Sequence, residues 1–193
     1  MNKKHVFTIV TTTRRTNNRV RSFAKELASS LCCALKINRG KLNIEELWYL
    51  AREYGAKRVV IVCRGLYGNP GRLVFLICNG DSPSFYPLIL KLGGIKLARE
   101  EGIRLTQPKN ITPIAVSVEE PDIILFGQEL AAALYLPFLG YSTLEDLNQF
   151  ESIIYVEKVG SKKTKYVVKF LSPKDGAITG PKIFVREAYY RTP

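Results

Sequence analysis

Apolar residues recur along the chain at two different spacings, which predicts an alternation of strands and helices. Residues 5–10 and 57–63 are short runs rich in Val and Ile, as is typical of strands buried within a sheet. Between these runs, residues 19–34 and 44–54 carry apolar side chains at the three- and four-residue spacing of amphipathic helices. A short extended piece at 34–37 separates the two helices, so the first third of the chain is expected to read strand, helix, strand, helix, strand.

The rest of the chain predicts more strands, separated by a segment with a less regular pattern. Turn residues at 68–71 lead to a strand at 72–78. Prolines and glycines interrupt residues 81–113, so we interpret that segment as a connection in which 95–99 is a candidate strand. Beyond it the pattern predicts strands at 114–118, 152–159, 164–171 and 182–188, and helices at 123–136 and 143–150. This order indicates an α/β protein with helices packed on sheets.

The formal net charge of +12 is concentrated in two stretches of the chain. Residues 1–60 carry 13 Lys and Arg against 4 acids, and residues 158–193 carry 9 against 2. Residues 121–157 instead carry 6 acids and no Lys or Arg. A basic excess confined to parts of a chain favours a surface that attracts phosphate groups. The alternative is a solvated surface that keeps the protein dispersed in water.

The most informative segment, residues 11–27, joins the first strand to the first helix. It predicts a hydroxyl-rich loop and a helix start, where free backbone N–H groups and the helix dipole favour an anion. Its basic residues are Arg14, Arg15, Arg19 and Arg21, with Lys25 one turn after Arg21. Guanidinium groups match phosphate oxygens with two parallel hydrogen bonds, so these side chains are candidate contacts to a nucleic-acid backbone. The alternative is that the arginines pair with the acids of residues 121–157 or face water.

Other basic and aromatic residues are weaker candidates for the same function. A predicted hairpin turn carries Lys162, Lys163 and Lys165. It is equally consistent with a charged tip that prevents edge pairing. Arg64 and Arg72 flank the turn at 68–71, for which a plain connecting turn is the more economical interpretation. Most tyrosines fall at apolar periodic positions, and those that do not are Tyr67, Tyr189 and Tyr190. These three are candidates for base stacking.

The sequence lacks the usual catalytic and metal-binding patterns. The glycines of residues 65–71 lack the Gly-Lys-Ser/Thr ending of a P-loop, and His5 is the only histidine. The four cysteines have no zinc-site spacing and are expected to be buried. We therefore expect no enzymatic activity, no cofactor and no metal. There is also no apolar run of about 18 residues and no signal-peptide pattern, so we expect a cytoplasmic protein without a membrane span.

Residues 12–27 also resemble the signature of the Brix-domain family. That signature combines a Thr/Ser stretch ending in two arginines with Arg-x-Arg-x-Phe-x-Lys-Glu-Leu. Here it reads Thr12-Thr13-Arg14-Arg15 and then Arg19-Val20-Arg21-Ser22-Phe23-Ala24-Lys25-Glu26-Leu27. Thr16 stands where the family usually has a proline, a departure at a loop position. Chain length and element order add a weaker likeness to the short archaeal members.

The resemblance implies a single Brix domain over residues 1–193, with two similar α/β halves at about 1–99 and 110–193. Each half would be like the anticodon-binding domain of class II aminoacyl-tRNA synthetases. It implies a non-enzymatic ribosome biogenesis factor that binds ribosomal RNA or a pre-ribosomal particle, alongside other assembly proteins. Two alternatives stay open. One is a protein-docking module, suggested by the acidic residues 121–157 and the apolar run 134–141, and the other is a tRNA-binding module.

Overall fold

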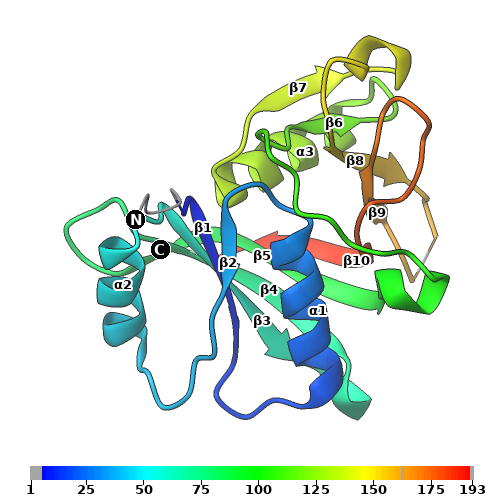
Figure 1. Cartoon of the computed structure of the whole chain (residues 1–193). Coiled ribbons are helices and arrows are strands. Elements are labelled where there is room, and N and C mark those ends of the chain that lie inside the picture. The colour runs from blue at the N-terminus through cyan, green and yellow to red at the C-terminus, as the bar shows by residue number, and fades with distance from the viewer. Residues whose placement is uncertain (1–5, 162, 192–193) are drawn as a thin grey trace.

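The computed structural model describes residues 6–161 and 163–191 as a mixed α/β fold built on one ten-stranded sheet (Figure 1). The strands are β1 Thr8–Thr12, β2 Ala34–Lys36, β3 Arg58–Arg64, β4 Pro70–Ile77, β5 Ser84–Lys96, β6 Ile114–Val116, β7 Phe138–Tyr141, β8 Ile153–Lys158, β9 Tyr166–Leu171 and β10 Lys182–Tyr190. The helices are α1 Asn18–Ser29, α2 Ile44–Glu53 and α3 Pro121–Leu134, with 3-10 helices η1 Leu66–Gly68, η2 Ala98–Glu101 and η3 Glu145–Leu147. The prediction of an α/β protein is confirmed.

The sheet consists of two sections that repeat one pairing pattern, in the overall order β2-β1-β3-β4-β5-β10-β9-β8-β6-β7. In the first section, β1 is parallel to β2 and β3, and β4 and β5 follow antiparallel. In the second section, β6 is parallel to β7 and β8, and β9 and β10 follow antiparallel. The sections join where β5 pairs antiparallel with β10. Consequently α1 and α3 occupy equivalent places, each between two parallel strands.

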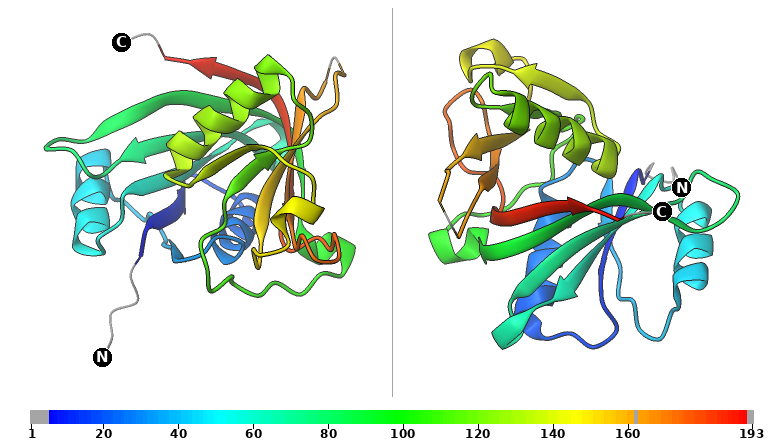
Figure 2. Two further views of the ribbon diagram at one scale, coloured as in Figure 1. Left: turned by 90° about the horizontal axis from the view of Figure 1, so that it is seen from above. Right: turned by 180° about the vertical axis from the view of Figure 1, so that it is seen from behind.

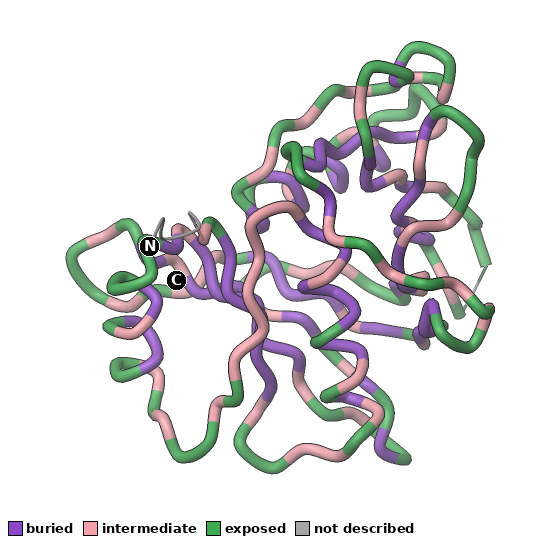
Figure 3. The backbone as a smooth tube through the Cα atoms, viewed as in Figure 1, coloured by how far each residue is buried: buried purple, intermediate pink, exposed green. Residues whose placement is uncertain are grey.

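The largest hydrophobic core lies on the sheet face covered by α1 and α3, and both sections contribute to it. Successive residues of a strand point to opposite faces of the sheet. Val60 therefore joins this core, whereas Val59 and Ile61 pack with Leu47 and Trp48 of α2 on the other face. Figure 3 shows the buried positions concentrated along the central strands and the inner sides of the helices. The loops that lead out of this core are where charged side chains reach the solvent.

The first helix starts as predicted but ends earlier. Asn17 caps it, because its side-chain oxygen accepts a hydrogen bond from the backbone N–H of Val20 at 3.1 Å. α1 ends at Ser29 rather than at residue 34. Cys33 then adopts a left-handed φ of 54°, which turns the chain into β2. The amide of Gln107 donates hydrogen bonds to the carbonyl oxygens of Ala28, Leu31 and Ala34, so the connecting segment closes this end of the helix.

The segment interpreted as a connection contains the longest strand of the sheet. β5 pairs with β4 on one side and with β10 on the other, so the interpretation of residues 81–96 was wrong. Pro87 lies where the β4–β5 register shifts, and Gly93 lies where the β5–β10 register shifts. At such irregularities a strand tolerates a residue without an N–H donor or without a side chain. The candidate strand at 95–99 is instead the end of β5 followed by η2.

The apolar run at 134–141 is only partly exposed. Leu134 ends α3, and residues 138–141 form β7, which pairs with β6 at the edge of the sheet. Phe138 packs against the main core, while Leu139 and Tyr141 are more than one third exposed. The helix predicted at 143–150 is reduced to the single turn η3, where Thr143 and Asp146 bond each other. The remaining predicted strands and helices are confirmed, with ends shifted by a few residues.

Candidate nucleic-acid interface

The loops that follow β1 and β2 enclose a cleft of about 290 Å³ beside the start of α1. We call it the arginine cleft, and its lining residues are Thr12, Thr13, Arg14, Thr16, Arg21, Asn38, Arg39 and Gly40. Because β1 and β2 are parallel neighbours, their ends lie at the same edge of the sheet. That arrangement brings Arg39 next to Arg14, although 24 residues separate them in the sequence.

The guanidinium groups of the arginine cleft repel one another and have no carboxylate partner within residues 6–161 and 163–191. Arg14 Nε and Arg39 Nε donate hydrogen bonds to the same acceptor, the carbonyl oxygen of Leu42, at 3.3 and 3.1 Å. Burial, and after it the neighbouring charge of Arg14, lowers the pKa of Arg39. Guanidinium groups remain protonated at neutral pH, so two like charges stay close together. An anion placed between them would relieve this repulsion.

Two hydroxyl groups in the arginine cleft are also unsatisfied. Thr13 Oγ1 and Thr16 Oγ1 are buried and have no hydrogen-bond partner among the described residues. Buried polar side-chain atoms without a partner are uncommon in folded proteins, because leaving them unpaired costs about 1–3 kcal/mol. Each hydroxyl can donate to an acceptor such as a phosphate oxygen. The cleft therefore combines fixed positive charge with free neutral donors, which suits the phosphate backbone of a nucleic acid.

Arg15 and Arg19 differ from the arginines of the cleft. Arg15 is exposed on the loop, and no ion pair to it occurs within residues 6–161 and 163–191. Arg19 forms an ion pair with Glu100 of η2 through both terminal nitrogens. The hydrogen bond from Arg19, followed by one from the backbone N–H of Leu97, lowers the pKa of Glu100. Arg19 is thus occupied by a carboxylate, although not by one from the acidic residues 121–157.

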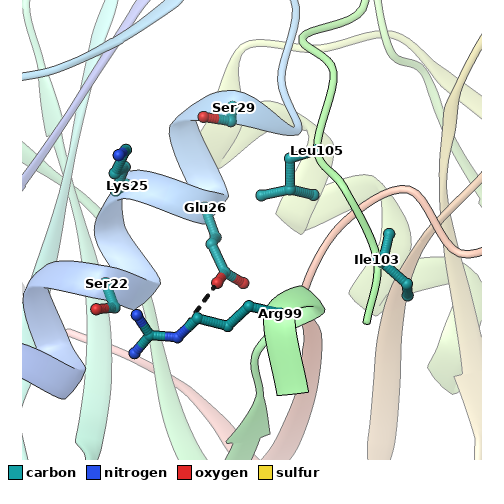
Figure 4. A pocket seen from close by; sticks show the side chains of 7 residues that line it. All are labelled: Ser22, Lys25, Glu26, Ser29, Arg99, Ile103 and Leu105. Atoms are coloured by element: carbon teal, nitrogen blue, oxygen red, sulfur yellow. Dashed lines mark ion pairs between the residues drawn. The ribbon is translucent and has the colours of Figure 1, made fainter. Parts of the chain in front are cut away.

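Lys25 lies in a second hollow, of about 340 Å³, on the next turns of α1 (Figure 4). There Ser22, Lys25, Glu26 and Ser29 of α1 face Arg99, Ile103 and Leu105. Glu26 is buried and accepts a hydrogen bond from the backbone N–H of Ala98 at 2.7 Å, with Arg99 Nε 4.0 Å away. Because a carboxylate already occupies this hollow, it is less suited to a phosphate than the arginine cleft.

The lysine candidates lie elsewhere in the molecule. Lys163 and Lys165 are exposed on the turn between β8 and β9, in the second section, away from the loops beside α1 (Figure 1). Lys165 Nζ lies 5.1 Å from the ring centroid of Tyr166. Lys162 lies outside the described residues. Among the tyrosine candidates, Tyr67 is 98% exposed, Tyr190 is exposed and Tyr189 is half-buried.

The described part of the chain shows neither a metal-ligand cluster nor a membrane-spanning helix. No group of three or more His, Cys, Asp or Glu within residues 6–161 and 163–191 is arranged to hold a metal ion. No helix in these ranges is long and apolar enough to cross a membrane. Cys78 is buried as expected, whereas the other three cysteines are half-buried.

Sequence reasoning missed Arg39, which contributes to the arginine cleft. In the sequence Arg39 sits in a turn, Asn38-Arg39-Gly40, with no apolar repeat around it. Its proximity to Arg14 depends on the parallel pairing of β1 with β2, which places both loops at one edge. Arg39 could have been found as a basic residue in the loop after a neighbouring parallel strand, but only if the order of the strands in the sheet were already known.

The chain is similar to several archaeal proteins. It is 31% identical over 136 residues to the probable Brix domain-containing ribosomal biogenesis protein of Pyrococcus abyssi, covering 67% of this chain and 60% of that protein. The protein of the same name from Aeropyrum pernix is 37% identical over 93 residues, covering 47% of this chain and 50% of that protein. The chain is a homologue of archaeal Brix-domain proteins. This confirms the resemblance to the Brix-domain family, and the chain spans about three fifths of the Pyrococcus Brix protein that it matches.

Solved structures share the fold of this Brix homologue. A probable ribosomal biogenesis protein from Aeropyrum pernix K1 superposes with a TM-score of 0.78 at 24% identity, covering 93% of this chain and 95% of that one. Mil, an archaeal Imp4-like protein, gives a TM-score of 0.62 at 21% identity, covering 95% and 99%. At these identities the likeness concerns the fold. No protein-family model matches the chain.

Proposed function

We propose that this chain is a non-enzymatic ribosome biogenesis factor that binds ribosomal RNA through the phosphate backbone. The observation that carries the proposal is the arginine cleft, where, among the described residues, three guanidinium groups have no carboxylate partner and two buried hydroxyls are unsatisfied. The relatives of this chain are named ribosomal biogenesis proteins, which supports ribosomal RNA rather than another polyanion as the ligand. Contacts of this type hold the backbone and carry little sequence information.

The RNA contacts fall into an inner and an outer group. The inner group is Arg14, Arg21 and Arg39, which line the arginine cleft. The outer group consists of the exposed residues Arg15 and Lys25, with Lys162, Lys163 and Lys165 as contacts to a longer RNA. Arg19 would contact RNA only by exchanging Glu100 for a phosphate, so its main role is to hold η2 against α1.

The two sections are further proposed to be the two halves of a single Brix domain, each like an anticodon-binding domain. The repeated pairing pattern of β1–β5 and β6–β10 supports this division. The shared core on the α1 and α3 face argues that the halves fold as one unit. The partners expected for such a domain are a pre-ribosomal particle and other assembly proteins.

The test is the affinity for ribosomal RNA fragments, measured by fluorescence anisotropy as a function of salt concentration. The variant R14Q/R21Q/R39Q removes the inner group while keeping polar side chains. Each lost phosphate contact lowers the slope of log affinity against log salt by about 0.7–0.9, so the slope should fall by about 2. We expect the affinity at about 0.15 M salt to drop on the order of 10- to 100-fold.

A matched control separates the site from the overall charge. R104Q/K109Q/K174Q also removes three positive charges, from exposed residues outside the cleft. It should leave the salt slope close to that of the unmodified chain. If both triple variants reduce affinity and slope equally, RNA binding follows net charge and the cleft is not the site.

A protein-docking function is the second candidate, because β7 is an edge strand with exposed apolar side chains. Leu139 and Tyr141 on β7 and Tyr135 just before it are between one third and one half exposed. An exposed sheet edge is a template for pairing with another chain. If L139S/Y141S abolishes association with pre-ribosomal particles while RNA affinity is unchanged, docking is the primary function.

A further inference from the structure

The turn between β3 and β4 presents an aromatic side chain to the solvent. Tyr67 is 98% exposed and the preceding Leu66 is 80% exposed. Within the described residues, no hydrogen bond or ring contact involves the Tyr67 side chain. Tyr67 also has a left-handed φ of 51°, which is unusual and strained for a residue other than Gly, Asn or Asp. The chain therefore holds a large apolar ring in water at an energetic cost.

Backbone hydrogen bonds hold the turn tightly, so the backbone of Tyr67 has a defined position. The backbone N–H of Gly65 donates to the carbonyl oxygen of Asn69 at 2.7 Å, and the N–H of Asn69 donates to that of Leu66 at 3.1 Å. Gly65 and Gly71 approach so closely that a Cβ on Gly65 would lie 2.7 Å from the Cα of Gly71. Only glycine fits both positions, and this close crossing lets the turn project outward.

Asn17 connects this turn to the start of α1. Its side-chain nitrogen donates to the carbonyl oxygen of Gly68 at 2.6 Å, while its side-chain oxygen caps the helix at Val20. Asn17 follows the loop that carries Arg14 and Arg15. Figure 1 and the right-hand view of Figure 2 both show the β3–β4 turn beside the first turn of α1. One side chain thus holds the backbone of the turn that carries Tyr67 next to the arginine segment.

The surroundings of the turn are cationic. Arg64 and Arg72 flank it at the ends of β3 and β4, both are exposed, and neither forms an ion pair with a described residue. An exposed aromatic ring among unpaired arginines is the composition of a surface that binds single-stranded nucleic acid, where the ring stacks on a base and the cations hold phosphates. A protein partner would instead favour a wider apolar patch of several hundred Å².

We propose that Tyr67 is a stacking platform for an unpaired base of the RNA whose phosphates bind the arginine segment. This inference rests on the proposed function and sharpens it, because it specifies RNA with unpaired nucleotides rather than a continuous duplex. Purine bases should bind better than pyrimidines, because their larger rings cover more of the tyrosine face. Arg64 and Arg72 hold the phosphates on either side of the stacked base.

The test compares Tyr67→Ala and Tyr67→Phe, using a 12-nucleotide single-stranded RNA with one central 2-aminopurine and a blunt duplex of the same sequence. Loss of one base stack should weaken single-strand binding about 10-fold in the alanine variant, within the range found for such substitutions. Binding to the duplex should stay unchanged. The phenylalanine variant should retain binding and the fluorescence quenching that reports stacking. Tyr49→Ala, which removes a 58% exposed tyrosine on α2, is the matched control.

The outcomes separate this inference from the proposed function. Tyr67→Ala removes no charge, so the salt slope should equal that of the unmodified chain, unlike R14Q/R21Q/R39Q. If the unmodified chain binds RNA with a steep salt slope but Tyr67→Ala binds the single strand equally well, only the stacking inference is overturned. It is also overturned if the variant binds RNA normally but loses a protein partner, or weakens duplex and single strand alike. If the unmodified chain binds neither RNA, the proposed function and this inference fail together.

Discussion

The β1–α1 and β6–α3 junctions occupy equivalent places in the two sections but carry opposite charge. The first carries Arg14 and Arg15 before a helix capped by Asn17. The second carries Glu119 and Glu120 before a helix that starts at Pro121 without a side-chain cap. Both have the strand-to-helix geometry that exposes backbone N–H groups at a helix start.

The second junction pairs part of its charge within the chain, whereas the arginines of the cleft at the first junction have no such partner among the described residues. Lys158 of β8 forms ion pairs with Glu120 and Asp122. In the first section, the arginines of the cleft meet no carboxylate among the described residues. The two helix starts therefore present the same backbone N–H groups, but the side chains around them carry opposite charge. We propose that side-chain charge at the junction, rather than the fold, determines which section would bind RNA.

Exchanging the charges of the two junctions should have the largest effect on the affinity for RNA. The variant R14E/R15E/E119R/E120R keeps the formal net charge of +12. Two phosphate-facing cations become anions, so affinity for ribosomal RNA should fall on the order of 100-fold. Anisotropy titrations at several salt concentrations measure this effect. Unchanged affinity would mean that net charge alone recruits RNA.

The two helices also differ in what a glutamate attaches each of them to: Glu26 holds α1 to η2, and Glu129 holds α3 to β5. Glu26 of α1 is buried and accepts the backbone N–H of Ala98. Glu129 of α3 accepts the Tyr86 hydroxyl at 3.0 Å from a half-buried position. Glu26→Ala should lower the free energy of unfolding by about 1–3 kcal/mol, because it leaves a buried donor unpaired. Glu129→Ala should cost less, since water can reach its partner. Urea denaturation measures the free energy of unfolding of both variants. A larger decrease for Glu129→Ala than for Glu26→Ala would contradict this prediction.

Removing the helix caps should show a smaller difference between the sections. Asn17→Ala removes the acceptor for Val20 and should cost about 1 kcal/mol. Glu120→Ala removes no cap and should have no capping effect. Because Asn17 also holds the β3–β4 turn, its loss should increase hydrogen exchange at residues 65–69. Equal exchange in both variants would show that the turn is held by its own backbone bonds.

The smallest expected effect concerns pH. The Arg19 hydrogen bond lowers the pKa of Glu100 in the folded state, so the pair stabilises the protein above the unfolded pKa of about 4.3. That contribution is lost as the pH falls through the lowered pKa. Arg19→Gln should cost no more than about 1 kcal/mol at pH 7, because the pair is partly exposed. The difference should shrink below about pH 4.3. Unfolding curves at both pH values test this, and a difference that grows in acid would be inconsistent with the ion pair.

The sequence predicted the elements whose local pattern agrees with their place in the sheet. The helix α1 and the strand β3 have a strong apolar pattern. β5 was missed because Pro87 and Gly93 are unfavourable in a strand, and only the register shifts of the assembled sheet accommodate them. Local pattern carries no information about such shifts.

The candidate site was predictable in part for the same reason. Arg14 and Arg21 lie on a recognisable loop and helix, so the sequence pointed to them directly. The ion pair of Arg19 with Glu100 and the contribution of Arg39 depend on residues brought together by the sheet. The segment that supplies Glu100 was interpreted only as a connection, so its proximity to α1 was not foreseeable.

The most direct measurement is a crosslinking map of the unmodified chain bound to a ribosomal RNA fragment containing 4-thiouridine, read by mass spectrometry. We expect crosslinked peptides that contain residues 12–21, 38–40 and 64–72, and none that contains residues 117–122. Crosslinks confined to the second section, or spread evenly over all basic residues, would contradict it.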